Sequence, residues 1–373
     1  MVKSGRVTLR LTCLRRNEMT GALLFRKALW RVKDSFLQWF WFITSVDKRR
    51  IGYDRGLLTL LRVAGHRRSR KRIRLCLLDL HPRRGKFGRF MSFWINENSS
   101  VCSASVNEGI EDADAVWIYS QDPLPLETKR EIREILRKKK PEAPVMNHPD
   151  SYNSYHEEIC FDRLRAAGVS VPRSDFSDAD IGRTYAVYKV LGKHGASKFL
   201  GPYRGRIEGY RAFEFCDSRT SDGMFRKYRA FYILGNVIPY HLVFSDCWNV
   251  HRETRKRTEY NFDITEREAG SVRLIARTLK IEYFAVDFIR RSQDDLPVFT
   301  DINVYPLPIE LTETGRELGY FGRWMVLDTR PRLGLPEPHG RSFWSIFDEA
   351  MKAFVARGDS YLPGDTLAGR APK

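Results

Sequence analysis

The sequence predicts an α/β protein whose C-terminal part is of α+β type, preceded by a basic helical extension. Short apolar runs alternate with an amphipathic helix between residues 72 and 149, and strand patterns dominate the residues that follow. The chain has 373 residues, of which 42% are hydrophobic and 13% aromatic. It can therefore bury a sizeable core, which excludes a wholly disordered protein.

The positive charge of the chain is concentrated in its first quarter. The formal net charge is +18, to which residues 1–90 contribute +19 and residues 91–373 contribute −1. A protein that coats nucleic acid along its whole length is excluded, because most of the chain has balanced charge. Nucleic acid is therefore not an expected partner of residues 91–373.

Residues 1–71 form the basic, partly helical extension, with Met1 and Met19 as the two candidate initiators. Apolar residues recur at helical spacing over 23–46, with basic residues between them. This pattern predicts a helix that either lies on an anionic membrane surface or on nucleic acid, or packs on the protein with its basic face in solvent. The longest apolar run, 35–46, has 12 residues, whereas a bilayer requires about 20.

The six cysteines form no C-x-x-C pair, and a chain of this size does not need disulfides. We therefore expect reduced thiols and a cytoplasmic protein, either free or peripheral to a membrane.

Residues 72–149 predict a small parallel α/β domain. The apolar runs 73–80 and 113–120 are typical of buried strands. Residues 126–140 have the pattern of an amphipathic helix that ends in four cations, which suit a helix C-terminus. A further short strand is expected at 144–147.

A second unit is predicted over 150–330, and residues 331–373 are expected to hold a last helix at 343–355 and a tail. Helices are expected at 155–167 and 265–279. The predicted strands are 185–190, 211–215, a hairpin over 228–238 that turns at Gly235-Asn236, 283–289 and 297–304.

Several common catalytic motifs are absent from the sequence. It contains no G-x-x-x-x-G-K-[ST], no G-x-G-x-x-G after a strand, no G-x-S-x-G and no H-E-x-x-H. Its eight histidines are scattered, so a zinc site is not expected.

Polar residues in two late strands carry the first chemical signal. Asp287 lies inside an apolar strand, while Asp301 and Asn303 alternate along the next strand and so share a face. Carboxylate and amide oxygens are ligands that suit Mg²⁺. The alternative is a buried, hydrogen-bonded Asp287 and a turn-forming Asn303 before Pro306.

Basic residues beside strands carry the second signal. Lys189 ends a strand before the glycine-containing loop 192–198, and Arg229 begins a hydrophobic strand. These cations and the backbone N–H groups of the loop either bind a polyphosphate or belong to ordinary strands with their charges in solvent.

The order of these motifs resembles the ATP-grasp superfamily, whose members are mostly carboxylate–amine ligases. The resemblance covers about residues 145–310 and implies a two-subdomain ATP-grasp fold, with 72–149 as the domain that precedes it. The motifs that carry it are Asn147-His148-Pro149, 164–172, Lys189 with loop 192–198, Phe213-Glu214-Phe215, 228–235, Val286-Asp287-Phe288 and 299–303.

The resemblance implies ATP and Mg²⁺ as cofactors, with Mn²⁺ as an alternative metal. It assigns phosphate contacts to Lys189, Lys198 and Arg229, with Lys189 and Arg229 catalytic. It assigns adenine contacts to Glu214, metal binding to Asp287, Asp301 and Asn303, and ribose binding to either Asp217 or Asp222. The family usually has Glu where this chain has Asp301, whose side chain is one methylene shorter.

The expected activity is an ATP-dependent ligase that activates a small-molecule or peptide carboxylate as an acylphosphate for attack by an amine or other nucleophile. The alternatives are an ATP-grasp-type kinase and a non-catalytic nucleotide-binding protein that acts through its basic N-terminus. His241, Trp248 and His251 either line the acceptor site or are a structural tryptophan and surface histidines. Asp287→Asn and Asp301→Asn are both expected to abolish turnover with the fold intact.

Overall fold

The computed structural model describes residues 73–80, 88, 91–92, 95–96, 99–120, 123–190, 198–249, 256–260, 262–306 and 343–358. The predicted N-terminal extension with its helix over 23–46, most of the loop 192–198, and His251 lie outside these residues. Within the described part, no helix is long and apolar enough to cross a membrane.

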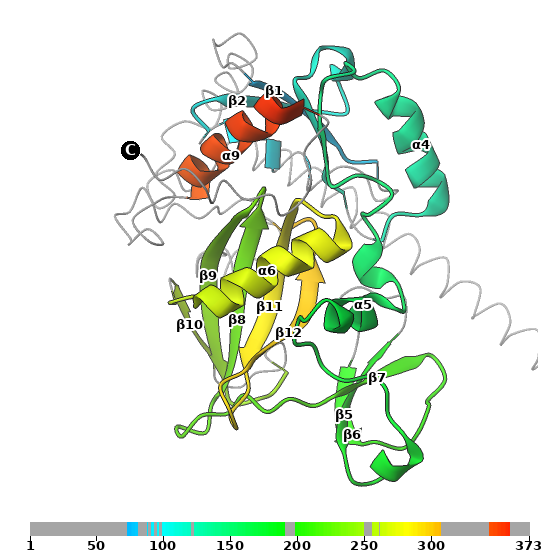
Figure 1. The fold of residues 1–373 in the computed structure, drawn as a ribbon, viewed down its shortest axis with the longest axis vertical. Helices are drawn as coiled ribbons and strands as arrows, with labels where there is room; N and C mark the ends of the chain where they lie inside the picture. The colour runs from blue at the N-terminus through cyan, green and yellow to red at the C-terminus, as the bar shows by residue number, and fades with distance from the viewer. Residues whose placement is uncertain are drawn as a thin grey trace, which may run out of the picture. The chain divides into compact units, whose positions relative to one another are not determined.

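The first unit is a parallel sheet, as the sequence predicts, and it has four strands, one more than the three expected (Figure 1). Its strands are ordered β2-β1-β3-β4, with α4 (Leu126–Leu136) between β3 and β4. The strand bounds are β1 Ile73–Leu78, β2 Cys102–Val106, β3 Ala115–Ile118 and β4 Val145–Met146. The sequence pattern did not reveal β2, because this strand contains two serines and pairs along one side only.

The second sheet is antiparallel and has the strand order β10-β9-β8-β11-β12 (Figure 1). Its strand bounds are β8 Phe225–Ile233, β9 Asn236–Ser245, β10 Lys256–Tyr260, β11 Tyr283–Arg290 and β12 Pro297–Asn303. Helix α6 (Glu266–Leu279) packs on β8 and β9. It begins at a capping box in which Thr265 and Glu268 satisfy each other's backbone N–H groups.

A separate three-stranded antiparallel sheet has the order β6-β5-β7. Its strands are β5 Tyr185–Val190, β6 Lys198–Pro202 and β7 Tyr210–Glu214. Strand β6 was not predicted, because Lys198 was expected to be the last residue of the loop 192–198. Short 3-10 turns complete the described elements at η1 Ile110–Asp112, η2 Ser154–His156 and η3 Asp178–Asp180.

Two local predictions were wrong. The helix expected over 155–167 is interrupted, because Glu157 is extended (ψ 139°) between η2 and α5 (Cys160–Ala166). The hairpin turns one residue earlier than predicted, at Leu234 and Gly235, whose φ values are 47° and 96°. A two-residue hairpin turn of this kind needs positive φ at both central positions.

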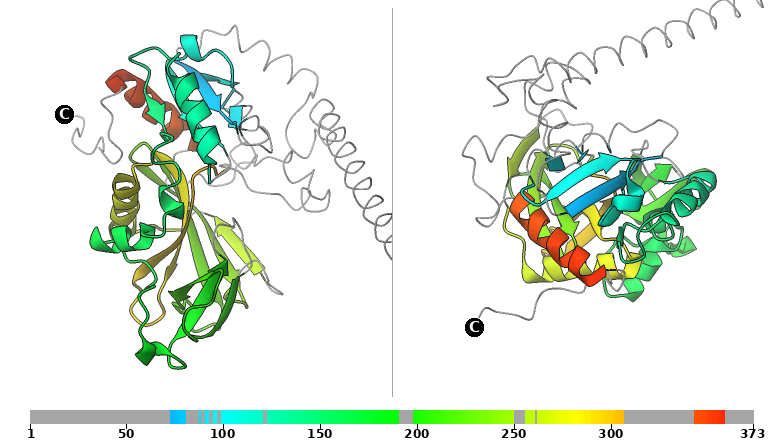
Figure 2. Two further views of the ribbon diagram at one scale, coloured as in Figure 1. Left: turned by 90° about the vertical axis from the view of Figure 1, so that its right-hand side faces the viewer. Right: turned by 90° about the horizontal axis from the view of Figure 1, so that it is seen from above.

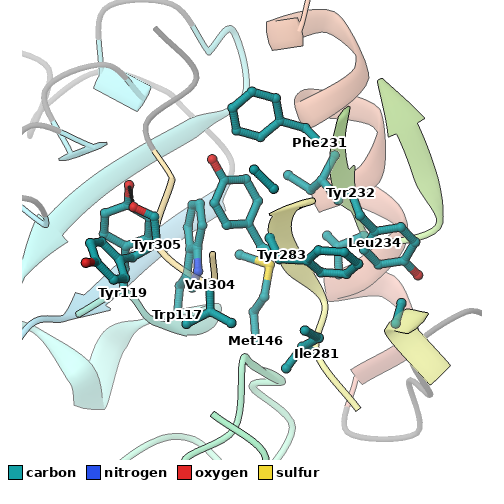
Figure 3. Close-up of a cluster of buried hydrophobic side chains, with 14 of the residues drawn as sticks. Trp117, Tyr119, Met146, Phe231, Tyr232, Leu234, Ile281, Tyr283, Val304 and Tyr305 are labelled. Atoms are coloured by element: carbon teal, nitrogen blue, oxygen red, sulfur yellow. Dashed lines mark hydrogen bonds between the residues drawn. The ribbon is translucent and has the colours of Figure 1, made fainter. Parts of the chain in front are cut away.

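Aromatic side chains from both larger sheets share one core (Figure 3). The ring centres of Trp117 on β3 and Tyr283 on β11 lie 4.7 Å apart. Tyr119 donates a hydrogen bond to the carbonyl of Tyr305, and Tyr283 donates to that of Pro306. Helix α9 (Phe343–Arg357) adds Phe347 to this core beside the parallel sheet (Figure 2). The chain that follows β12 is therefore held from two sheets.

Candidate functional site

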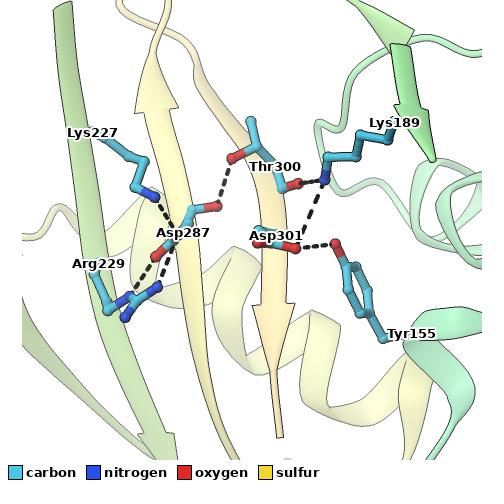
Figure 4. Close-up of polar contacts among 7 residues, drawn as sticks. All are labelled: Tyr155, Lys189, Lys227, Arg229, Asp287, Thr300 and Asp301. Carbon is cyan, nitrogen blue, oxygen red and sulfur yellow. Dashed lines mark hydrogen bonds and ion pairs between the residues drawn. The ribbon is translucent and has the colours of Figure 1, made fainter. Parts of the chain in front are cut away.

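Three of the predicted site residues form one row across β8, β11 and β12 (Figure 4). In the strand register, Arg229 lies opposite Asp287, and Asp287 lies opposite Asp301. The register of β11 against β12 shifts immediately after Asp287. Such an irregularity locally alters the pairing and twist of the strands beside a site.

Asp287 is held by two cations. Arg229 donates from Nε to Oδ1 at 2.5 Å and from Nη2 to Oδ2 at 3.0 Å. Lys227, also on β8, donates from Nζ to Oδ2 at 2.6 Å. Burial of Asp287, which is 3% exposed, opposes its ionisation, but the two cations outweigh this effect and hold the pKa of the carboxyl well below its usual range.

Asp301 is more accessible, since its side chain is 54% exposed. It accepts a hydrogen bond from the hydroxyl of Tyr155, and the Nζ of Lys189 lies 3.8 Å away. Loss of hydration opposes ionisation of Asp301, but the attraction of Lys189 keeps its pKa lowered. Lys189 also donates to the carbonyl of Thr300 at 3.2 Å, which fixes the end of β5 beside β12.

Of these residues, Lys189, Lys227, Asp287, Thr300 and Asp301 line a cleft that encloses about 850 Å³ of space, part of which is open to solvent. One set of lining residues is apolar and comes mainly from β5, β7 and β11: Val187, Phe213, Phe215, Ile289 and Phe161. The other set is charged: Lys189, Lys198, Lys227, Arg226, Asp287, Asp301 and Glu214. The cleft therefore combines an apolar lining with a charged one of four cations and three carboxylates.

Lys198 lies among other cations in this cleft. Burial, together with repulsion from Lys227 and Lys189, lowers its pKa to about 8. Its ammonium group lies 5.7 Å from the centre of the Trp248 ring, which also lines the cleft. An anion in the cleft would relieve the repulsion among these lysines.

The cleft contains six of the predicted site residues, namely Lys189, Lys198, Glu214, Trp248, Asp287 and Asp301. The remaining described ones do not line it. Arg229 contacts Asp287, His241 lies opposite Arg229 on β9, and the Asn303 Oδ1 accepts from the backbone N–H of Tyr305. Asn303 thus serves the turn that was the alternative interpretation of the sequence.

Neither candidate for ribose binding lines the cleft. Asp217 accepts hydrogen bonds from Arg219, and Asp222 accepts from Thr220 and Arg226. Both carboxylates are therefore engaged within the turn that precedes β8.

Two residues of the site, Lys227 and Tyr155, were not predicted from the sequence. Lys227 had a usable signal, because it lies two residues before Arg229 and so shares its face of β8. Tyr155 had none, since it contacts Asp301, 146 residues away in the chain, only through the fold.

The donor set fits a divalent cation only in part. Among the described residues, no group of three or more His, Cys, Asp or Glu side chains is arranged to hold a metal ion. Asp301 offers an accessible carboxylate, as Mg²⁺ requires. Asp287 is already neutralised by Lys227 and Arg229, and the Asn303 oxygen is used by the backbone.

No family model and no curated protein matches the chain. Similar solved structures include the ATP-grasp ligase PsnB complexed with a minimal precursor, at 16% identity and a TM-score of 0.46, over 63% of this chain and 92% of that one. The macrocyclase MdnC from Microcystis aeruginosa MRC, bound with precursor peptide MdnA, gives 12% identity and 0.45 over 62% and 92%.

D-alanine–D-alanine ligase from Bacillus anthracis gives 12% identity and a TM-score of 0.42 over 70% of this chain and 98% of that one.

Proposed function

We propose that the protein is an ATP- and Mg²⁺-dependent ligase that activates a carboxylate for attack by an amine or another nucleophile. One observation carries this proposal: a single cleft joins an apolar lining to Asp287 and Asp301, which three lysines surround. An apolar region beside a cluster of fixed cations suits a nucleotide, whose base is flat and weakly polar and whose phosphates are strongly anionic.

The nucleotide base would lie against Phe213 and Phe215 on β7 and just after it, with Glu214 available as a hydrogen-bond acceptor. Its phosphates would lie toward Lys189, Lys198 and Lys227. A divalent cation at Asp301 supplies, when bound, neutralisation of charge on the phosphate oxygens.

The residues of the cleft would act mainly by positioning and by stabilising charge. A carboxylate oxygen of the substrate attacks the γ-phosphorus, ADP leaves, and the nucleophile then displaces phosphate from the acylphosphate. Fixed ammonium groups stabilise the negative charge that spreads over the transferred phosphoryl oxygens. Burial raises the pKa of the Cys216 thiol in the cleft to about 12, so it is a poor nucleophile. The substrate would be a peptide or small-molecule carboxylate.

The proposal is tested first by thermal unfolding with and without Mg-ATP. A ligand at about a hundred times its dissociation constant stabilises the folded state by about 2.7 kcal/mol. The wild type should show this shift, and Lys189→Ala and Asp301→Asn should lose most of it. Both changed side chains are partly exposed, at 30% and 54%, so both variants should fold.

Each variant has a matched control elsewhere on the surface. Lys138→Ala removes an exposed lysine after α4, and Asp294→Asn removes a carboxylate that is 47% exposed at the other end of the β11–β12 hairpin. Both controls should retain the full shift. A folded wild type without a shift would overturn the nucleotide assignment. Once binding is established, an amide or ester product together with free phosphate would identify a ligase, whereas a phosphorylated acceptor would refute the ligase assignment.

A further inference from the structure

The ammonium group of Lys227 lies where it can replace a metal ion bound to Asp287. It is 18% exposed, lines the cleft, and lies 2.6 Å from Oδ2 of Asp287. Arg229 already pairs with both oxygens of the same carboxylate (Figure 4). One negative charge is thus shared by two positive ones, and the group as a whole is cationic.

This arrangement makes Asp287 a poor ligand for a divalent cation. Both of its oxygens accept hydrogen bonds from cations, and the side chain is 3% exposed. A metal ion bound there would lie against the Lys227 ammonium group and be repelled by it. Asp301 differs, because it is 54% exposed and its nearest cation, the Nζ of Lys189, lies 3.8 Å away.

We propose that Lys227 is a fixed cation of the nucleotide site. The protein then binds a nucleoside triphosphate with one divalent cation, held at Asp301, and without a second divalent cation at Asp287. The ammonium group contacts the phosphates from the side of Asp287. Lys227 is thus a binding residue for the phosphates in addition to being a partner of Asp287. This inference rests on the proposed function and specifies its metal requirement.

The experiment uses the full chain, with Lys227→Met and Lys227→Arg as variants. Lys227→Met removes the cation but leaves the Arg229–Asp287 pair, so Asp287 keeps a counterion and the variant should fold. Lys227→Arg restores the charge, and Lys138→Met is the surface control. Unfolding midpoints without ligand establish that each variant is folded.

Two quantities are measured with a non-hydrolysable ATP analogue. Mn²⁺ bound per chain at saturating analogue, counted by electron paramagnetic resonance, should be one in the wild type. The affinity for the analogue in EDTA, measured by calorimetry, should fall by about ten- to a hundredfold in Lys227→Met, which corresponds to the loss of one charge-assisted hydrogen bond. Lys227→Arg should recover most of this loss.

Two Mn²⁺ ions per wild-type chain would overturn the inference and leave the proposed function standing. So would a Lys227→Met variant that binds the analogue in EDTA as tightly as Lys138→Met does. A folded wild type that binds no analogue, with or without metal, would overturn the proposed function and the inference together. The outcomes are therefore distinguishable.

Discussion

Replacing Asp287 with asparagine should destabilise the folded protein by about 3 kcal/mol, whether or not the protein binds ATP. Asparagine has nearly the same shape as aspartate but leaves Lys227 and Arg229 without their shared counterion. Removing one partner of a buried ion pair costs about 3–5 kcal/mol. The lower end applies here, since Lys227 and Arg229 are 18% and 28% exposed and water can partly hydrate them.

This expectation corrects the one drawn from the sequence, in which Asp287→Asn abolishes turnover with the fold intact. Loss of activity in this variant cannot by itself identify a catalytic role, because stability falls as well. Asp301→Asn is the better probe of function, since Asp301 is 54% exposed.

The assay is urea unfolding of the wild type, Asp287→Asn, Lys227→Met and the double variant. The loss of unfolding free energy in the double variant should be smaller than the sum of the losses in the two single variants. The reason is that Lys227→Met removes one of the two cations that Asp287→Asn leaves without a counterion. Asp287→Asn within about 0.5 kcal/mol of the wild type would refute the electrostatic reasoning.

The pH dependence gives a second check on Asp287. A carboxyl whose pKa is lowered on folding contributes stability above its unfolded pKa of about 3.9, and this contribution is lost as the pH falls toward the folded pKa. The folded pKa of Asp287 is lowered by Arg229 and Lys227 against the effect of burial. Asp287→Asn should therefore be most destabilised relative to the wild type near neutral pH, and the difference should shrink below about pH 4.

Three further predictions concern single residues. Lys198, whose pKa burial and its lysine neighbours lower to about 8, should bind the phosphates of Mg-ATP less well as the pH rises through 8. Titration of the dissociation constant from pH 7 to 9.5 should show this loss, and Lys198→Arg should be nearly flat, because an arginine stays charged. Burial raises the pKa of Glu282 from 4.5 to about 8, so its contribution to stability is fully present below pH 4.5 and is lost as the pH rises toward 8. Glu282→Gln keeps an acceptor for the backbone N–H of Asn147. In urea unfolding at pH 8 this variant should be more stable than the wild type by more than about 1 kcal/mol. Equal stability of the two proteins would contradict the raised pKa of Glu282. Thr265→Ala should cost about 1 kcal/mol by removing the cap of α6, whereas Ser271→Ala within the helix serves as the control and should cost less.

Local sequence patterns were sufficient to predict several helices and strands. Apolar runs identified β1, β3 and β11, and helical spacing identified α4 and α6. The apolar run placed Asp287 in β11, and the strand pattern over 297–304 placed Asp301 in β12, so the sequence pattern alone was enough to select both carboxylates as site candidates. Short strands with polar residues, such as β2, gave too weak a pattern to be found.

The contacts of these candidates depend on the fold and could not be predicted from local patterns. Strand pairing brings Arg229 to Asp287 from 58 residues away, and Lys227 comes with it because alternate side chains of β8 share a face. Tyr155 reaches Asp301 across 146 residues, while Asn303 is turned to its own backbone. The sequence pattern around a carboxylate does not distinguish a metal ligand from the partner of a cation. The choice depends on which charges the fold brings within a few ångströms, and for Asp287 those charges are Lys227 and Arg229.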